Sequence, residues 1–261
     1  MNRTSVSRRR IVASAALLGG GVGASFGAAA SDASLRALRQ GPTIDLNNAA
    51  DLLAVLTRLH GNIAPGRPRF DWFDGTVSLV SAAGDLRTLC GIRGYGEAHI
   101  APSDGGRGTW TCRRRVFANY TDLESGGVAP VLQNPLTGVW VTPRGVTTET
   151  RYTLSAETPR VEFRLDGDVV LMDETATAAA SPLPGRAKTT RSVSMADIQN
   201  HDLTTVRDTG TWRVVTPWMP WLEMGQAPGH CVIDCLRGGG AMMLSELPAA
   251  IVNAFADAPA A

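Results

Sequence analysis

Lysine is nearly missing from this 261-residue sequence: Lys188 is the only one, so almost all of the 25 basic residues are arginines. No Gly-x-Ser-x-Gly elbow is present, and Gly238-Gly239-Gly240 lacks the lysine and the helix start of a phosphate-binding loop. The motifs that would identify a serine hydrolase or a nucleotide-binding enzyme are therefore absent. No cofactor is expected.

The first thirty residues indicate a secretory signal. The basic run Ser7-Arg8-Arg9-Arg10 precedes an uncharged stretch, residues 13–30, that ends in small residues. This is the layout of a secretory signal, and paired arginines mark the twin-arginine route. The stretch is short and interrupted by glycines, so it makes a poor membrane-spanning helix. We expect the twin-arginine export machinery to export the chain, residues 1–30 to be removed, and the mature protein to be periplasmic or secreted without stable membrane insertion.

Removal of that signal changes the charge balance. Taking the four arginines of residues 1–30 from 25 basic residues leaves 21 against 24 acidic residues, a net charge near −3. A slightly acidic chain gives no electrostatic reason to bind nucleic acid. Nucleic acid is therefore not an expected partner.

Cysteines are few, and the chain does not need them as cross-links. About 230 residues can bury a substantial core without disulfides. Three complete pairings are possible for Cys90, Cys112, Cys231 and Cys235. Export would permit a disulfide to form. Cys231 and Cys235 flank Val232-Ile233, which favours a strand and would hold the thiols roughly 13 Å apart. No metal site is expected.

The mature chain reads as one strand-rich domain, residues 45–256, after a flexible segment at residues 31–44. Apolar residues at helical spacing predict a helix over residues 45–59, with Asp45 or Asn47 as N-cap and Gly61 beyond its end. Gly75 suggests a bulge or bend in the strand that follows. A short helix over residues 194–201, capped by Ser194, and a final helix over residues 245–255 are also expected.

Hairpins dominate between these helices. Residues 87–100 and 109–120 flank the turn Ser103-Asp104-Gly105-Gly106, and residues 161–166 and 168–172 flank Gly167. Such a series predicts a mainly β fold, an antiparallel sheet curled into a barrel or half-barrel, with an N-terminal helix and a C-terminal helix.

Two stretches carry a resemblance to a known family. They are Asn119-Tyr120-Thr121-Asp122 with Gly126 and Asn134-Pro135-Leu136-Thr137-Gly138, and Thr211-Trp212 with Pro217-Trp218-Met219-Pro220-Trp221-Leu222-Glu223-Met224-Gly225-Gln226-Ala227-Pro228-Gly229-His230. Together they resemble an uncharacterised bacterial and fungal family, domain of unknown function 1838, over about residues 45–255. Val139 stands where many relatives carry an acidic residue. The resemblance implies no activity, because none is assigned to that family.

One predicted strand carries a row of polar side chains. Arg93, Tyr95, Glu97 and His99 occupy alternate positions, so they share one face. If that face lines a barrel, Glu97 and His99 could transfer protons, with Tyr120 or Asp122 nearby, while Arg93 or Tyr95 polarises a carbonyl. If it faces water, the row is a solvated surface. The next strand splits similarly, with Arg114 beside Cys112 on one face and Arg113 with Arg115 on the other. These arginines either bind an anion or, on the strand exterior, deter edge pairing.

The tryptophan-rich stretch after residue 211 also allows two interpretations. Its prolines and glycines prevent regular structure, yet its large apolar groups favour burial. Those groups are Trp212, Trp218, Trp221 and Met224. They either wall a cavity for an organic ligand, with Glu223 or His230 as a polar contact, or fill the core. His60 and His201 are expected on the surface.

Three functions remain open. The leading one is binding of a small, largely apolar organic molecule in a barrel cavity closed by residues 218–221. The second is a cofactor-independent lyase, isomerase or hydrolase that uses Glu97, His99 and Tyr120. The third is an envelope interaction protein without a small ligand, which would show an exposed apolar patch.

Overall fold

In the computed structural model, residues 43–103, 108–155, 160–176, 185–240 and 242–256 are described. The expected signal peptide, most of the expected flexible segment and Asp104-Gly105-Gly106 of the expected turn lie outside them. Among the described residues, no helix is both long and apolar enough to cross a membrane.

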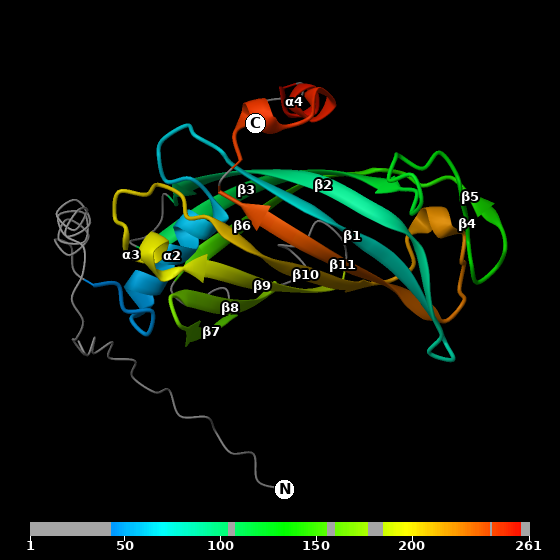
Figure 1. The fold of residues 1–261 in the computed structure, drawn as a ribbon, viewed down its shortest axis with the longest axis horizontal. Helices are drawn as coiled ribbons and strands as arrows, with labels where there is room; N and C mark the ends of the chain where they lie inside the picture. Colours follow the sequence, from blue (N-terminus) through cyan, green and yellow to red (C-terminus); the bar gives the residue numbers. More distant parts are fainter. Residues whose placement is uncertain (1–42, 104–107, 156–159, 177–184, 241, 257–261) are drawn as a thin grey trace, which may run out of the picture.

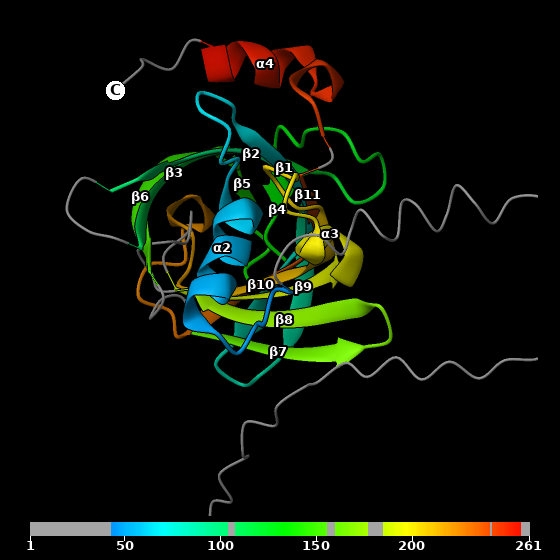
Figure 2. The same ribbon diagram turned by 90° about the vertical axis from the view of Figure 1, so that its left-hand side faces the viewer.

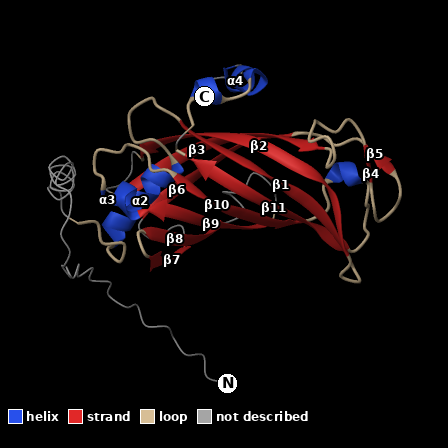
Figure 3. Cartoon of the chain, viewed as in Figure 1, coloured by secondary structure: helices blue, strands red, loops and turns tan. Residues whose placement is uncertain are grey.

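Long strands whose side chains alternate between two faces form most of the fold. Nine of them make one antiparallel sheet in the order β6-β3-β2-β1-β11-β10-β9-β8-β7. Their bounds are β1 (Arg69–Ser81), β2 (Leu86–Pro102), β3 (Thr109–Thr121), β6 (Val146–Ser155), β7 (Arg160–Asp166), β8 (Val169–Ala176), β9 (Arg186–Ser194), β10 (Asp208–Thr216) and β11 (Gly229–Gly239). The sheet curls into a half-barrel with β6 and β7 as its edges (Figures 1 and 3). The predicted mainly β fold is confirmed.

Helices lie around this sheet. Helix α2 (Ala49–His60) lies across one end of the half-barrel with α3 (Met195–Gln199) beside it, as Figure 2 shows. Helix α4 (Ala249–Ala256) lies on the outer surface. At the end opposite α2, β4 (Leu132–Gln133) and β5 (Trp140–Val141) form a separate small sheet (Figure 1).

Helix α2 begins later than the sequence predicts. Asn48 is its N-cap, because Asn48 Oδ1 accepts hydrogen bonds from the backbone N–H groups of Ala50 (2.9 Å) and Asp51 (3.3 Å). The predicted caps Asp45 and Asn47 were wrong. Asp45 belongs to the preceding turn, where its carboxylate accepts from the Asn47 N–H (3.0 Å). Gly61 follows the helix as expected.

The predicted bulge at Gly75 was also wrong. Strand β1 runs through Gly75, and its register with β2 shifts between Val77 and Ser78 instead. Gly75 lets the backbones of β1 and β11 approach closely, because a Cβ atom there would collide with the β11 backbone at Asp234.

Both short helices differ from prediction at their N-termini. Ser194 precedes α3 but makes no side-chain cap hydrogen bond. At the C-terminal end a 3-10 turn (Leu244–Glu246) comes first, and α4 starts at Ala249 directly after Pro248. A proline at the start of a helix is compatible with its geometry, because the missing N–H would have no partner there.

Apolar side chains fill both ends of the half-barrel interior. At the α2 end, Leu56 and Leu59 pack with Met172, Val193 and Ile198. The other cluster joins the middle strands to the tryptophan segment, defined here as residues 217–228; among its buried members are Val77, Ile92, Val116, Ile233, Met219 and Leu222. A third cluster lies outside the sheet, where Phe255 of α4 packs with Phe70 and Leu247. Between the two inner clusters the interior is polar, and this zone positions the candidate site.

Candidate functional site

The polar row of β2 lies on the outer face of the sheet. A Cβ atom on Gly94 would collide with the Phe73 ring, and one on Gly96 with the Asp71 carboxylate, so both glycines face the interior. Side chains alternate along a strand. The row therefore projects outward: Arg93, Tyr95, Glu97 and His99. Because Phe73 and Asp71 occupy the space beside the inner face of β2, only small residues fit there.

On that outer face the row makes its own contacts. Arg93 Nε donates to Asp74 Oδ2 (2.7 Å) in an exposed pair. Glu97 pairs with Arg115, and His99 Nε2 lies 3.3 Å from Glu97 Oε1. Tyr95 packs against the cluster under α4. The structure brings Glu97 and His99 together, but on the side of the sheet opposite to the interior.

Tyr120 lies in the interior, against the tryptophan segment. Its hydroxyl donates to Met219 Sδ (2.8 Å), and its ring centroid is 4.8 Å from that of Trp221. Tyr120 and the Glu97–His99 pair therefore do not form one site. Asp122 holds a turn instead, where its carboxylate accepts from Ser125 N–H (2.8 Å).

The tryptophan segment fills its end of the half-barrel. Trp218 Nε1 donates to the Ala227 carbonyl (2.6 Å), which satisfies the indole, and Leu222 is buried. Met224 Sδ accepts a hydrogen bond from Asn134 Nδ2 (3.2 Å). His230 lies one position before the buried inner residue Cys231 and so takes the outer face. Of the predicted ligand-binding residues, Trp212, Trp218, Trp221 and Met224 pack against the inner cluster. The structure places Arg93, Tyr95 and His230 outside it.

Charged side chains meet inside the half-barrel, between the two apolar ends. They come from β1, β3, β8, β9, β10 and β11 at inner-face positions. The set, called here the inner network, contains Arg69, Asp71, Arg114, Glu174, Arg191, Asp208 and Arg237. Within the described part of the chain, its four guanidiniums face three carboxylates, which leaves one positive charge in excess.

Asp208 is the centre of this network. Its carboxylate pairs with Arg69, Arg237 and Arg191, the last at 2.8 Å. Burial would raise the pKa of Asp208, but the three guanidiniums outweigh burial and hold that pKa below its ordinary value. Both carboxylate oxygens of Asp71 accept hydrogen bonds from Arg114 Nη2 (2.9 Å each). Burial lowers the pKa of Arg69 to about 10, with Arg191 and Arg237 adding repulsion.

His60 connects helix α2 to the network. His60 Nδ1 lies 2.8 Å from the Tyr152 hydroxyl, and Nε2 lies 2.7 Å from Glu174 Oε1, off the line of a good hydrogen bond. Glu174 also accepts from Arg191 Nε (3.1 Å). The result is a chain of contacts from Tyr152 through His60 to Glu174. Tyrosine, histidine and carboxylate in this order can relay a proton.

Burial sets the protonation of this chain of contacts. Desolvation lowers the pKa of His60 despite the opposing effect of Glu174, so the imidazole is neutral at neutral pH. Burial would raise the pKa of Glu174, but His60 and Arg191 lower it, so the carboxylate stays ionised. Burial raises the pKa of Tyr152 well above its ordinary value. A neutral phenol and a neutral imidazole therefore lie within hydrogen-bond distance of each other, with the carboxylate beside the imidazole.

Part of the inner face keeps exposed surface and unused hydrogen-bonding groups. The Arg114 side chain is 21% exposed although it projects inward, and Tyr152, Thr148 and Trp212 are half-buried. Among the described residues, neither Arg114 Nε nor Thr148 Oγ1 has a hydrogen-bond partner, and both atoms are buried. Buried polar groups are normally satisfied. The inner face next to Arg114 therefore contains two polar atoms without a partner, beside an apolar wall in which the ring centroids of Phe73 and Trp212 lie 5.2 Å apart.

The four cysteines are free and buried. Burial raises the pKa of Cys90 to about 12 and that of Cys231 to about 11, which keeps both thiols protonated. No group of three or more histidine, cysteine, aspartate or glutamate residues suited to a metal ion occurs in the described ranges. The disulfide that export would permit is not formed.

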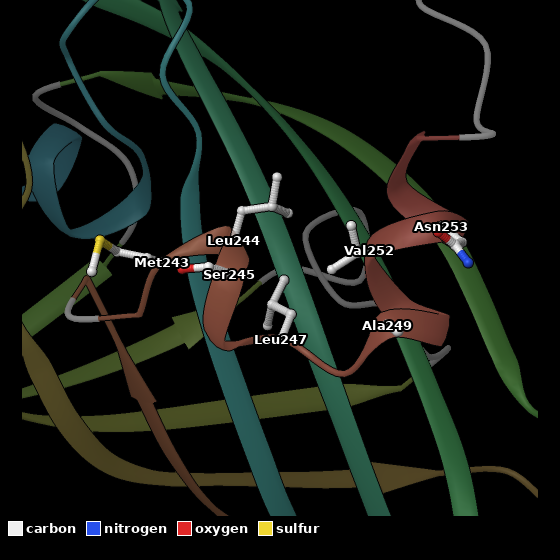
Figure 4. A pocket seen from close by; sticks show the side chains of 7 residues that line it. All are labelled: Met243, Leu244, Ser245, Leu247, Ala249, Val252 and Asn253. Atoms are coloured by element: carbon white, nitrogen blue, oxygen red, sulfur yellow. The ribbon is translucent and has the colours of Figure 1, made fainter.

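Two open hollows lie outside this interior. The larger runs between the 3-10 turn and α4 and is walled by apolar side chains; its lining includes Met243, Leu244, Leu247, Ala249 and Val252 (Figure 4). The other, over β7 to β9, includes Glu162, Phe163, Leu171 and Asp173. Neither contains a residue of the inner network.

Sequence reasoning missed most of this site. The prediction that His60 lies on the surface was wrong, because the C-terminal end of α2 turns it into the half-barrel. Arg114 carried the clearest signal: it alternates with Cys112 and Val116, both buried, so it shares their inner face. Tyr152 sits opposite Cys112 across the β3–β6 pair, which only the strand pairing reveals.

The chain has a recognisable similarity at its C-terminal end. Residues 190–259, about a quarter of the chain, match the family model of domain of unknown function 1838, described as a protein of unknown function. This confirms the resemblance of the tryptophan segment to that family. Comparison with curated proteins gave no match, and neither did comparison with solved structures.

Proposed function

We propose that the half-barrel binds a small organic molecule that has an apolar body and an anionic group. The observation that carries this proposal is Arg114, an inward arginine with exposed surface and an unpartnered Nε. The anionic group binds at Arg114, and the apolar body lies against Phe73 and Trp212. This keeps the organic ligand predicted from the sequence but adds a charge to it.

Charge balance supports an anion at this position. The inner network has one more guanidinium than carboxylate, and a buried charge is costly unless it is paired. Guanidinium groups bind carboxylate and similar oxyanions with two parallel hydrogen bonds. Arg114 uses Nη2 for Asp71, and its buried Nε has no hydrogen-bond partner among the described residues, so a ligand that reaches the inner face can supply one.

A fluorescent probe with the required chemistry tests the proposal. The probe 8-anilinonaphthalene-1-sulfonate has an aromatic body and one sulfonate, and its emission rises in apolar surroundings. We expect wild-type protein to bind it and Arg114→Gln to bind it about tenfold more weakly, since a hydrogen bond to a charged group contributes about 1.5–3 kcal/mol. Arg93→Gln is the matched control on the outer face and should bind like wild type. Equal affinity of Arg114→Gln and wild type would contradict the proposal.

A second candidate, an interaction protein, has its own supporting observation. Large apolar side chains are exposed near β4 and β5, including Val128 (67%) and Trp140 (65%). Leu123, Val131 and Val139 in the same region are also exposed. Sedimentation of Trp140→Ser beside wild type tests self-association through this surface: a shift toward monomer would favour it, and identical sedimentation would count against it.

Export remains part of the proposed function. The motif Arg8-Arg9 and the uncharged residues that follow support passage through the twin-arginine machinery. Arg8→Lys with Arg9→Lys should retain the precursor in the cytoplasm, as fractionation and intact mass would show. Unchanged export of this double variant would contradict the route.

A further inference from the structure

We propose that Tyr152, His60 and Glu174 form a proton relay that abstracts a proton from the carbon next to a carbonyl group in the ligand bound at Arg114. This inference rests on the proposed function and adds an activity to it: proton transfer on a carbonyl acid, the first step of an isomerase or lyase reaction without a cofactor.

The relay has its three groups in the required order. The Tyr152 hydroxyl lies 2.8 Å from His60 Nδ1, and His60 Nε2 lies 2.7 Å from Glu174 Oε1. Two distant segments and the end of α2 supply these residues, and each is fixed by further contacts. Arg191 holds Glu174 (3.1 Å), and the His60 ring packs edge-on to Tyr152 with centroids 5.8 Å apart. A nucleophile or base oriented by a second and third group is the arrangement of catalytic triads.

Arg114 places the ligand next to this relay. Across the β3–β6 pair, Arg114 faces Thr150 and Cys112 faces Tyr152, so Arg114 and Tyr152 occupy adjacent inner positions of neighbouring strands. The Arg114 side chain on that face is 21% exposed, and Tyr152 is half-buried. A carboxylate or carbonyl oxygen at Arg114 thus lies beside the phenol.

The proton transfer balances without another reactant. The C–H bond next to the carbonyl breaks, its proton bonds to the Tyr152 oxygen, and the phenol proton moves to His60 Nδ1. The electron pair of the broken bond becomes an enolate, whose oxygen is stabilised by Arg114. His60 becomes a cation and is stabilised by the Glu174 carboxylate. The reverse steps return a proton to the carbon.

Deuterium exchange into phenylpyruvate tests the relay. This probe has an aromatic body, a carboxylate and acidic hydrogens next to its carbonyl. In D2O, full-length mature protein should accelerate loss of the C3 proton signal above the buffer rate. Tyr152→Phe should reduce this acceleration on the order of 100-fold, which is within the range for general acid–base catalysis, and His60→Gln should have a similar effect. Tyr95→Phe and His99→Gln, the matched outer-face controls, should retain the wild-type rate.

Competition with 8-anilinonaphthalene-1-sulfonate separates the two proposals. If phenylpyruvate displaces the dye and exchange is unaccelerated, the relay is wrong and the binding function stands. If phenylpyruvate does not displace the dye, the carbonyl-acid ligand and the relay built on it both fail. Tyr152→Phe keeps the ring and its packing, so a folded Tyr152→Phe variant with undiminished exchange would also overturn the relay. Circular dichroism establishes folding for each variant.

Discussion

The hydroxyl of Tyr152 lies 2.8 Å from Nδ1 of His60, although 92 positions separate the two residues in the chain. One belongs to an edge strand of the half-barrel and the other to the last turn of the helix that covers its end. This contact joins α2 to the inner network, so the helix both caps the fold and completes the candidate site.

Asp208 is expected to be the most costly network residue to replace. Asp208→Asn leaves Arg69, Arg191 and Arg237 without their shared charge in a buried place, a loss of about 3–5 kcal/mol in the free energy of unfolding. Urea denaturation measures it. Asp234→Asn is the control, because Asp234 pairs with Arg213 on the exposed outer face and should change stability by less than about 1 kcal/mol. Similar losses for both variants would show that the network is not buried in solution.

The stability of the protein should fall in acid. The pKa values of Asp208 and Glu174 lie below their ordinary values in the folded chain. The unfolded chain therefore binds more protons as the pH falls below about 4, the range of unperturbed carboxyl groups, and stability is lost there. The lowered pKa of His60 adds a smaller loss that starts near pH 6.5. Thermal unfolding from pH 8 to 3 should show both steps, and His60→Gln should remove only the upper one. A stability that is constant down to pH 3 would contradict this.

The inward direction of the β2 glycines gives another test. Gly94→Ala places a methyl group against the Phe73 ring and Ala118, so it should destabilise the fold by about 1–3 kcal/mol. Gly127→Ala, whose new methyl would meet only Ser125 Oγ at 3.6 Å, is the control and should be nearly neutral. Thermal unfolding of the two variants and of wild type would measure the difference in stability. If Gly94→Ala were as stable as wild type, the outer position of Arg93 to His99 would be in doubt.

Much of the fold follows from sequence pattern, because alternation and turn residues determine strands locally. The hairpin around Gly167, the strand from residue 87 and the terminal helices were predicted on that basis. Which face of a strand turns inward depends on partners that local pattern does not contain. Arg93 to His99 share a face as their spacing requires, but Phe73 and Asp71 on β1 decide that this face points outward.

The inner network was harder to predict for the same reason. Asp71, Glu174 and Asp208 lie in separate strands, and each reads as a solvated residue until the strands pair. The abundance of arginine hid Arg69, Arg191 and Arg237 among surface arginines. His60 appeared to be a helix-end residue, and only the docking of α2 across the half-barrel brings it to Glu174.

Glu174 should act on the relay as a positioning residue, through the pKa of His60. Its carboxylate raises that pKa against the effect of burial, so Glu174→Gln should lower it further. The base form of His60 is the neutral imidazole. The acid limb of the exchange rate should therefore lie below pH 6.5 in wild type and move to lower pH in Glu174→Gln, as rate profiles from pH 4 to 8 would show. Glu97→Gln, on the outer face, should leave the profile unchanged. A limb that stays in place in Glu174→Gln would remove Glu174 from the relay.

We propose that the inner face at Arg114, rather than the polar row on the outer face, is the functional surface. A crystal structure of the protein with 8-anilinonaphthalene-1-sulfonate tests it most directly. We expect the sulfonate within ion-pair distance of Arg114 and the rings against Phe73 and Trp212. A dye bound on the outer face beside Tyr95 and Glu97, with the inner face unchanged, would contradict it.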